Sequence, residues 1–481
     1  METPPGGRRR QQPAPPTRPG YPRNPASRTN MRPQSDHYRP QSSIRVRRYP
    51  VPPTQREPEY FKQPNTFQTI FVKYKVLFLI AITSLSLLVI GLVRVNAPQS
   101  PTLLFLDMGP MQTQKNTSYP QSLMRGKVAS LGWIVGRDCQ RGMQAYLETA
   151  DNNPDAALVG TGWVDPTNGH LINGQSNNCM QHSLSMDNVV QLVHSKGGMA
   201  YLTVTMETDG AQGSWTSQQQ SDYIAKAASN QSYINSIIQE VKRANYDGVI
   251  MDMEAGDPNY PNIQQLFTTF NQRVWAALKP LHKYYGIALI HKLSDHDEYY
   301  YINGFENWTL LAHAADFMVI MAVDQSYFSP GPTVSVPWLQ QLLAYELKTM
   351  PQMLTHTIWE LPLYGATWKL ENGKWVFDTG VNYSDGVALV SHIPQSQIDT
   401  AASDLNDPTC AHLVYTDSSG VKHSLWYHTA KDLYTIISRF EIILNQVPQF
   451  KHSHLQIAVW YRATWEPGGV WSLVDNILPN P

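Results

Sequence analysis

Two carboxylates stand two residues apart at the end of an apolar run, in the segment YDGVIMDMEAGD at positions 246–257. Alternate side chains of a β-strand share a face, so a strand here points Ile250, Asp252 and Glu254 one way and the apolar residues between them the other. Two acids at this spacing lie about 6–7 Å apart at the backbone, and their side chains can converge and share a proton. Like charges so close raise one pKa, which yields an acid able to donate near neutral pH. The spacing therefore predicts an acid–base pair, and the alternative is a pair of solvated acids at a strand end.

Eight short apolar runs follow one another along the chain, and amphipathic stretches such as 221–244 and 263–281 separate several of them. This alternation predicts parallel βαβ units. Eight strands over about 350 residues predict the fold class α/β and, within it, a (β/α)8 TIM barrel. Active sites of such barrels form at the C-terminal ends of the strands, where Asp252 and Glu254 stand. The eight runs are 128–135, 156–164, 199–205, 248–253, 286–290, 317–323, 358–364 and 455–461.

The interval between the last two predicted strands, about 369–454, is too long for a simple crossover. It contains the segments NGKWVFDTG and VYTDSSGVKHSLWYH, which are typical of β-hairpins. We expect a small α+β insertion between barrel strands 7 and 8, within a barrel domain that occupies residues 126–481.

The segment that carries the two carboxylates resembles the signature D-x-x-D-x-D-x-E of glycoside hydrolase family 18, which includes chitinases. Asp247, Asp252 and Glu254 fall on its first Asp, its last Asp and its catalytic Glu. Ile250 stands where the signature has its second Asp.

Three later segments resemble further motifs of this family, in the order in which the family has them. ADFMVIMAVDQSYFSPGPTVSVPW resembles the M-x-Y-D motif of the sixth strand, where Met321 and Asp324 match and Val323 replaces the Tyr. ELPLYGATW, with Tyr364, resembles the seventh strand, and IAVWYRATWEPGGVW, with Trp460, resembles the eighth. The PGP loop and the eighth segment are most similar to the bacterial branch acting on peptidoglycan, including spore-cortex-lytic enzymes.

The resemblance implies a glycosidase that cleaves a β-1,4-linked N-acetylglucosamine polymer, peptidoglycan ahead of chitin, without a cofactor. Family members use a retaining, substrate-assisted mechanism. Carried over, Glu254 is the general acid and Asp252 orients the substrate acetamide. Trp460 forms the floor of the sugar site, and Asp324 and Tyr364 line the cleft. Asp247 and Met321 complete the expected substrate-binding residues.

Ile250 and Val323 depart from the family pattern. Ile250 removes a carboxyl that normally shares a proton with the residue at 252, so the protonation of Asp252 is open. Val323 removes a hydroxyl that supports the reacting acetamide, a loss of a few kcal/mol in the transition state by analogy with other electrostatic stabilisers. Tyr327 is a candidate substitute. The alternative functions are a catalytically impaired glycan-binding protein and a protein-interaction module.

The 481 residues have a formal net charge of −1 that hides a strong asymmetry. Residues 1–75 hold fifteen Lys and Arg against four acids, a net charge of +11, and 15 of the 35 prolines. The rest is acidic, so no nucleic-acid partner is expected. We expect residues 1–72 to form a disordered basic tail rich in Pro and Arg.

Residues 76–93 have no charge and no proline, and as a helix they span about 27 Å, close to one hydrocarbon core. We expect a single transmembrane helix at 73–94 and a linker at 95–125. The basic tail places the N-terminus in the cytoplasm and the barrel outside the cell membrane.

Three cysteines and one His/acid cluster lie in the predicted outer part. Cys139–Cys179 is the closer pair for a disulfide, although Cys139, Cys179 and Cys410 could all be unpaired. Residues 291–298 hold two His and three acids, but their spacing matches no ligand motif, so we expect a polar loop at the barrel rim and no metal site.

Overall fold

The structure is a computed structural model that describes residues 130–135, 139–149, 155–163, 171, 186–206, 216–254, 256–407, 409–451, 453 and 455–460. The predicted tail at 1–72, membrane helix at 73–94 and linker at 95–125 lie outside these residues, as does Cys179. Within the described ranges no helix has the length and apolarity needed to cross a membrane. Cys139 is disulfide-bonded, and Cys410 is a buried free thiol.

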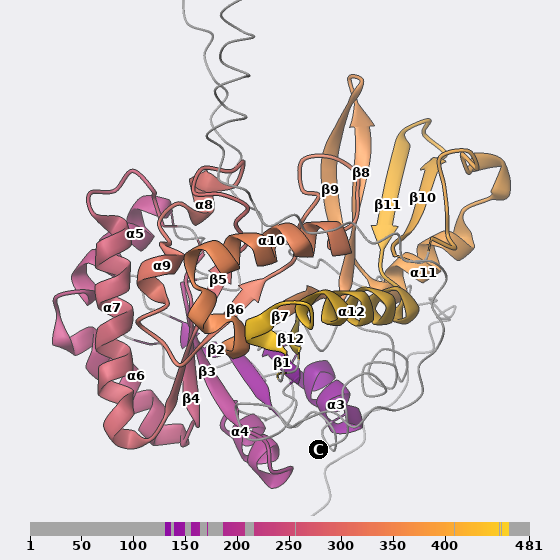
Figure 1. The fold of residues 1–481 in the computed structure, drawn as a ribbon. Coiled ribbons are helices and arrows are strands. Elements are labelled where there is room, and N and C mark those ends of the chain that lie inside the picture. The colour runs from indigo at the N-terminus through magenta and orange to yellow at the C-terminus, as the bar shows by residue number, and fades with distance from the viewer. Residues whose placement is uncertain are drawn as a thin grey trace, which may run out of the picture. The chain divides into compact units, whose positions relative to one another are not determined.

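Eight parallel strands close into a barrel in the order β1-β12-β7-β6-β5-β4-β3-β2 (Figure 1). This arrangement confirms the predicted (β/α)8 barrel, and each strand end lies within two residues of its predicted position. The strands are β1 Ser130–Val135, β2 Ala156–Trp163, β3 Ala200–Thr205, β4 Gly248–Asp252, β5 Tyr284–Ile290, β6 Phe317–Met321, β7 Thr357–Pro362 and β12 Gln456–Trp460.

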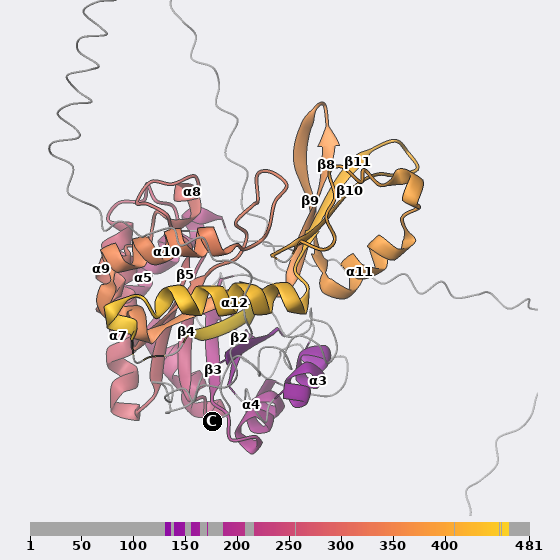
Figure 2. The ribbon, with the colours of Figure 1, turned by 45° about the vertical axis from the view of Figure 1, so that its right-hand side comes forward.

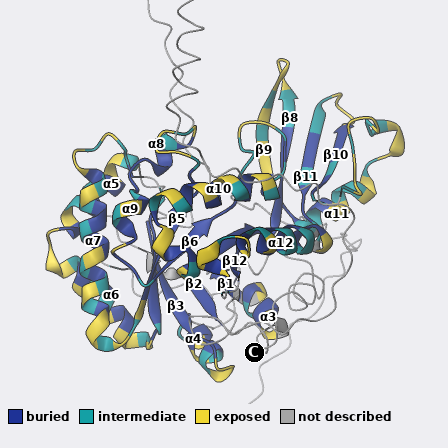
Figure 3. Cartoon of the chain, in the orientation of Figure 1, coloured by how far each residue is buried: buried dark blue, intermediate teal, exposed yellow. Residues whose placement is uncertain are grey.

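Helices surround the strands and bury their apolar sides against them (Figure 3). The amphipathic stretch 221–244 forms two helices rather than one, because the side chain of Asn230 accepts a hydrogen bond from the Ser232 N–H and so starts a new helix. The helices are α3 Cys139–Thr149, α4 Met186–Ser195, α5 Ser217–Ala227, α6 Gln231–Ala244, α7 Ile263–Leu278, α8 Tyr300–Asn303, α9 Trp308–Leu311, α10 Val336–Thr349 and α12 Ala430–Leu444.

Side chains alternate between the inside of the barrel and the helices. Inside, the rings of Tyr201 on β3 and Phe317 on β6 meet edge to face with centroids 5.7 Å apart. Gly286 leaves room for them, because a Cβ there would lie 2.3 Å from the Phe317 ring. Outside, Trp359 of β7 packs on Phe440 of α12, which lies beside β12 in Figures 1 and 2.

A separate four-stranded antiparallel sheet, in the order β10-β11-β8-β9, is inserted between β7 and β12. Its strands are β8 Tyr364–Glu371, β9 Lys374–Asn382, β10 Ala411–Thr416 and β11 Lys422–Tyr427. Both predicted hairpins are confirmed as β8–β9 and β10–β11. Asn372 and Gly373 join the first pair with positive φ angles of 50° and 76°, as a two-residue hairpin turn requires.

The bounds of the insertion differ from the predicted interval 369–454. The small sheet already begins at Tyr364. Helix α12 falls inside the predicted interval but packs on β7 of the barrel. The inserted residues therefore comprise the sheet and helix α11, Tyr383–His392, which packs against it.

Candidate active site

The C-terminal end of β4 carries the two predicted catalytic residues. Asp252 is the last residue of β4 and is 2 % exposed, and Glu254, two residues further on, is half-buried. In the β3–β4 pairing Asp252 lies beside Thr205, and Ile250 lies one step deeper beside Thr203. Both carboxyl groups lie largely away from bulk solvent, because Asp252 is buried and the Oε1 atom of Glu254 is buried as well.

Asp324 lies just beyond the C-terminal end of β6 and is fixed by two tyrosines. The Tyr364 hydroxyl donates to its carboxylate at 2.5 Å, and the Tyr299 hydroxyl donates to its main-chain oxygen at 3.1 Å. Asp324 is 6 % exposed and has a φ of 59°, in the left-handed region. A residue in this strained conformation persists only where surrounding contacts hold it, and such residues cluster at functional sites.

Trp460 and Met321 end their strands at the same end of the barrel. Trp460 is the last residue of β12, is 8 % exposed and packs edge-on against Trp133 with ring centroids 5.8 Å apart. Met321 is the last residue of β6 and pairs with Ile290 of β5. Strand ends β4, β6 and β12 thus bring together five of the seven predicted residues, and Tyr364 joins them through Asp324. This edge of the barrel is the candidate active site.

Asp247 lies at the opposite end of the barrel. It precedes β4, its carboxylate accepts from the Ala200 N–H at 2.8 Å and contacts His194 of α4 at 2.9 Å, and its own N–H bonds Ala200. Asp247 precedes Asp252 by five positions along the strand, about 16 Å. The prediction that Asp247 contacts substrate is therefore corrected: this carboxylate ties the start of β4 to β3 and α4.

Two buried charged residues beside this edge were missed by the sequence reasoning. Lys292, two residues after β5, is 2 % exposed, and its ammonium donates to the main-chain oxygen of Glu306 at 2.6 Å. Burial lowers the pKa of Lys292 and raises that of the fully buried Glu306 to about 8. Lys292 could have been noticed, because it stands just after the predicted strand 286–290, as Glu254 stands just after the predicted strand 248–253. Glu306 carries no such signal, since it stands in a loop far from Asp252 in sequence.

Aromatic residues join the loop after β6 to the small sheet. Tyr327 stacks on Phe377 of β9 with ring centroids 5.0 Å apart, and Trp368 of β8 donates its indole N–H to the Tyr327 main-chain oxygen. Trp368 is fully buried, so it supports this loop and does not form a sugar platform. Phe328, the residue after Tyr327, is 43 % exposed, and its ring packs on that of Tyr299.

The His/acid loop after β5 is a structural loop. His291 is buried between the rings of Tyr299 and Trp338, and burial lowers its pKa to about 4, so it is neutral. Asp297 accepts hydrogen bonds from the Leu293 and Tyr299 N–H groups. Among the described residues, no group of three or more His, Cys, Asp and Glu could hold a metal ion.

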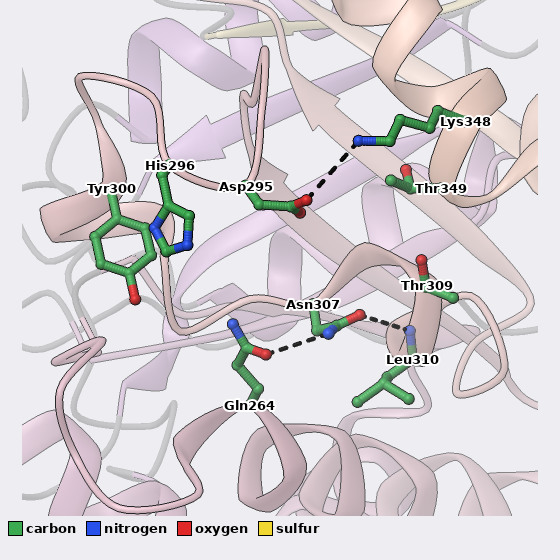
Figure 4. A pocket seen from close by; sticks show the side chains of 9 residues that line it. All are labelled: Gln264, Asp295, His296, Tyr300, Asn307, Thr309, Leu310, Lys348 and Thr349. Atoms are coloured by element: carbon green, nitrogen blue, oxygen red, sulfur yellow. Dashed lines mark hydrogen bonds and ion pairs between the residues drawn. The ribbon is translucent and has the colours of Figure 1, made fainter. Parts of the chain in front are cut away.

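A polar pocket of about 550 Å³ opens beside this loop and away from the predicted site residues, none of which lines it (Figure 4). Asp295 and Lys348 face each other across it at 3.9 Å, and Asn307 bonds Gln264.

Comparison with known proteins identifies the fold. No protein-family model and no curated protein sequence matches the chain. Among solved structures, a chitinase from Chromobacterium violaceum matches with a TM-score of 0.57 and 17% identity, over 72% of this chain and 98% of that chain. The C-terminal domain of a putative chitinase from Desulfitobacterium hafniense matches with 0.57 and 20%, over 73% and 99%. The Bacillus cereus spore cortex-lytic enzyme SleL matches with 0.57 and 18%, over 76% of both chains. The chain therefore has the barrel fold of these proteins.

Proposed function

We propose that this protein is a glycosidase of glycoside hydrolase family 18, which hydrolyses β-1,4 linkages in an N-acetylglucosamine polymer. The observation that carries the proposal is the carboxyl pair at the end of β4, with buried Asp252 and half-buried Glu254, in a barrel shared with chitinases. Barrel enzymes place their chemistry at this end of the strands.

Glu254 acts as the general acid in the proposed reaction. Its proton passes to the glycosidic oxygen as the bond to the anomeric carbon breaks, and the oxygen of the substrate's own 2-acetamido group attacks that carbon. Asp252, ionised, stabilises the resulting positive oxazolinium. Water then attacks the anomeric carbon and gives its proton to Glu254, while the bond between this carbon and the acetamido oxygen breaks and restores the acetamide. The product therefore keeps the starting β-configuration.

Three further residues would bind the sugar. The indole face of Trp460 suits the C–H groups of a pyranose ring. Asp324 offers a carboxylate that the Tyr364 hydroxyl holds in place, and Met321 adds an apolar wall at the end of β6. None of these steps requires a cofactor.

Peptidoglycan stands ahead of chitin as the proposed substrate. Chitinases and a spore cortex-lytic enzyme match this chain with the same TM-score of 0.57, so the order is supported only by the resemblance of the loop at 325–338 to the peptidoglycan-acting branch.

A catalytically impaired glycan-binding protein is the second candidate. Ile250 and Val323 favour it, because both are buried apolar residues where the family has an acid and a hydroxyl. The same site would then bind sugar without turning it over.

Turnover by the full-length protein tests these two functions. Peptidoglycan fragments and chitin oligosaccharides are incubated with the wild type, with Glu254→Gln and with Glu346→Gln, a buried glutamate of α10 outside the site. We expect turnover by the wild type and Glu346→Gln and none by Glu254→Gln. Sugar binding without turnover in the wild type would favour the glycan-binding protein. If the wild type neither binds nor hydrolyses these sugars, the protein-interaction module remains as the alternative.

We also propose a single-pass membrane anchor at 73–94, with the basic tail in the cytoplasm and the barrel outside. The charge asymmetry of the sequence supports this topology. Protease added to intact cells should degrade the barrel and spare an N-terminal tag. Protection of the barrel with cleavage of the tag would contradict it.

A further inference from the structure

Glu306 is a fully buried carboxyl group in the turn between α8 and α9. One of its carboxyl oxygens accepts the N–H of Ile290, the last residue of β5, at 3.2 Å, and the other accepts the indole N–H of Trp308 at 3.4 Å. A loop glutamate thus reaches into the end of the barrel sheet and takes a hydrogen bond from a strand.

This carboxyl lies where β4 and β5 separate, at the level of the proposed catalytic residues. The pairing between these strands ends at Met251 and Ile287, so the N–H of Ile290 bonds Glu306 instead. The flanking segments also touch: a Cβ on Gly256, two residues after Glu254, would lie 2.6 Å from the Phe305 ring. The loop that carries Glu306 therefore packs directly on the segment that carries Glu254.

Lys292 also holds the loop that carries Glu306, through a hydrogen bond. Its ammonium bonds the main-chain oxygen of Glu306 rather than the carboxylate. Lys292 is 2 % exposed, so its charge acts through a medium with little water. The acids whose charges raise its pKa, and so favour its charged form, are Glu306, Asp297 and Asp295.

We propose that Glu306 is the buried carboxyl partner of Asp252 in this chain, in place of the acid missing at position 250, and that Lys292 positions it. This inference rests on the proposed function, in which Asp252 is ionised although Ile250 replaces its usual carboxyl partner. Two neighbouring carboxyls ionise in sequence, and the one in the drier site keeps the proton. Glu306 then holds a proton at neutral pH, while Asp252 carries the charge that the oxazolinium needs.

Electrostatics agree with this assignment. Burial is the largest cause that raises the pKa of Glu306 to about 8, and the charge of Asp252 raises it further. Lys292 and the hydrogen bonds from Ile290 and Trp308 act in the opposite direction. Glu306 also acts on the phenol of Tyr345 on α10, whose pKa is raised above the ordinary value, mainly by burial and by the hydrogen bond to Asp295.

The coupling can be measured without any activity. Infrared spectra of the full-length protein report protonated carboxyls between about pH 6 and 9, where exposed acids are ionised. Glu306→Gln and Glu346→Gln should each remove one component of the carboxyl band, because burial raises the pKa of Glu346 to about 8 as well. In Asp252→Asn the Glu306 component should titrate at a lower pH, while that of Glu346 stays in place.

An unmoved Glu306 component, or equal shifts of both components, would overturn the proposal. Asp252→Asn keeps Glu306 in place, so the shift is measurable even where Glu306→Gln does not fold. This infrared measurement involves no substrate, so its outcome is separate from that of the hydrolysis assay. Coupling without hydrolysis would contradict the proposed glycosidase activity but would still support the pairing of Glu306 with Asp252.

A second measurement applies once the wild type turns over a glycan. Glu306→Gln should lower kcat by roughly 10- to 100-fold, the size expected when a reacting group is slightly misplaced. It should also displace the pH profile of kcat and leave KM within about twofold, as expected for a loss felt only in the transition state. Glu346→Gln should leave kcat and its pH profile unchanged. A wild-type pH profile in Glu306→Gln would contradict the positioning role.

Discussion

At the scale of residues, the pair Asp252 and Glu254 was readable from spacing alone, because a period of two puts both on one face of a strand. The motif also matched Asp247, but the fold places that carboxylate at the other end of the barrel, bonded to Ala200. Glu306 was beyond sequence reasoning, since its position depends on how the loop around it folds back onto β5. Local periodicity predicts which side chains share a strand face, whereas partners from distant loops need the tertiary structure.

The hydrogen bond between Tyr364 and Asp324 gives a prediction at this scale. Tyr364→Phe leaves a buried carboxylate without a charge-assisted donor, a loss of about 1.5–3 kcal/mol. We expect kcat/KM on an N-acetylglucosamine oligosaccharide to fall by roughly 10- to 100-fold. Tyr427→Phe, a buried tyrosine of the small sheet, is the matched control and should leave it unchanged. Equal kinetics in the two variants would remove Asp324 and Tyr364 from the proposed site.

At the scale of elements, all eight barrel strands and both hairpins followed from apolar runs and turn residues. The bounds of the insertion did not, because Tyr364–Trp368 continue the apolar pattern of β7 although they form β8 of the other sheet. The strands that β7 and β8 pair with decide where one sheet ends and the other begins, and a run of apolar residues does not show those partners.

The floor of the barrel gives a prediction at this scale. Gly286→Ala pushes a methyl group to 2.3 Å from the Phe317 ring, and overpacking of this kind destabilises a core by about 1–3 kcal/mol. Urea unfolding should show this loss. Gly386→Ala in α11 is the control, since its Cβ meets ordinary contacts at 3.5 Å or more, and it should gain about 0.5–1 kcal/mol. A destabilisation of the same size in both would contradict the proposed packing.

At the scale of the whole molecule, the sequence divides into a basic N-terminal part and an acidic barrel, and only the second lies among the described residues. The barrel buries several titratable groups. Burial raises the pKa of Glu306 and Glu346 to about 8 and lowers that of His291 and His428 to about 4. These opposite shifts set how the stability depends on pH.

The free energy of unfolding should fall between about pH 6.5 and 8. In this window the folded state keeps protons on the two glutamates, which the unfolded chain has already lost, so each contributes a slope of about −1.4 kcal/mol per pH unit. Between about pH 4.5 and 6.5 the two glutamates keep this negative slope, but the two buried neutral histidines give an opposite slope of similar size, because the unfolded chain binds their protons there. The stability should therefore change little in that range. Urea unfolding at several pH values checks this, and Glu346→Gln should flatten the upper slope. A stability that rises from pH 6.5 to 8 would contradict it.

The central claim is that Glu254 drives a retaining reaction in which the substrate's own acetamide attacks. Proton NMR of the first minutes of hydrolysis of an N-acetylglucosamine oligosaccharide tests it most directly, because the anomeric signal of the new reducing end appears before mutarotation. We expect the β-anomer first, and no product when Glu254→Gln replaces the wild type or when the sugars lack their N-acetyl groups. An initial α-anomer, or turnover of the N-deacetylated oligosaccharide at a comparable rate, would contradict it.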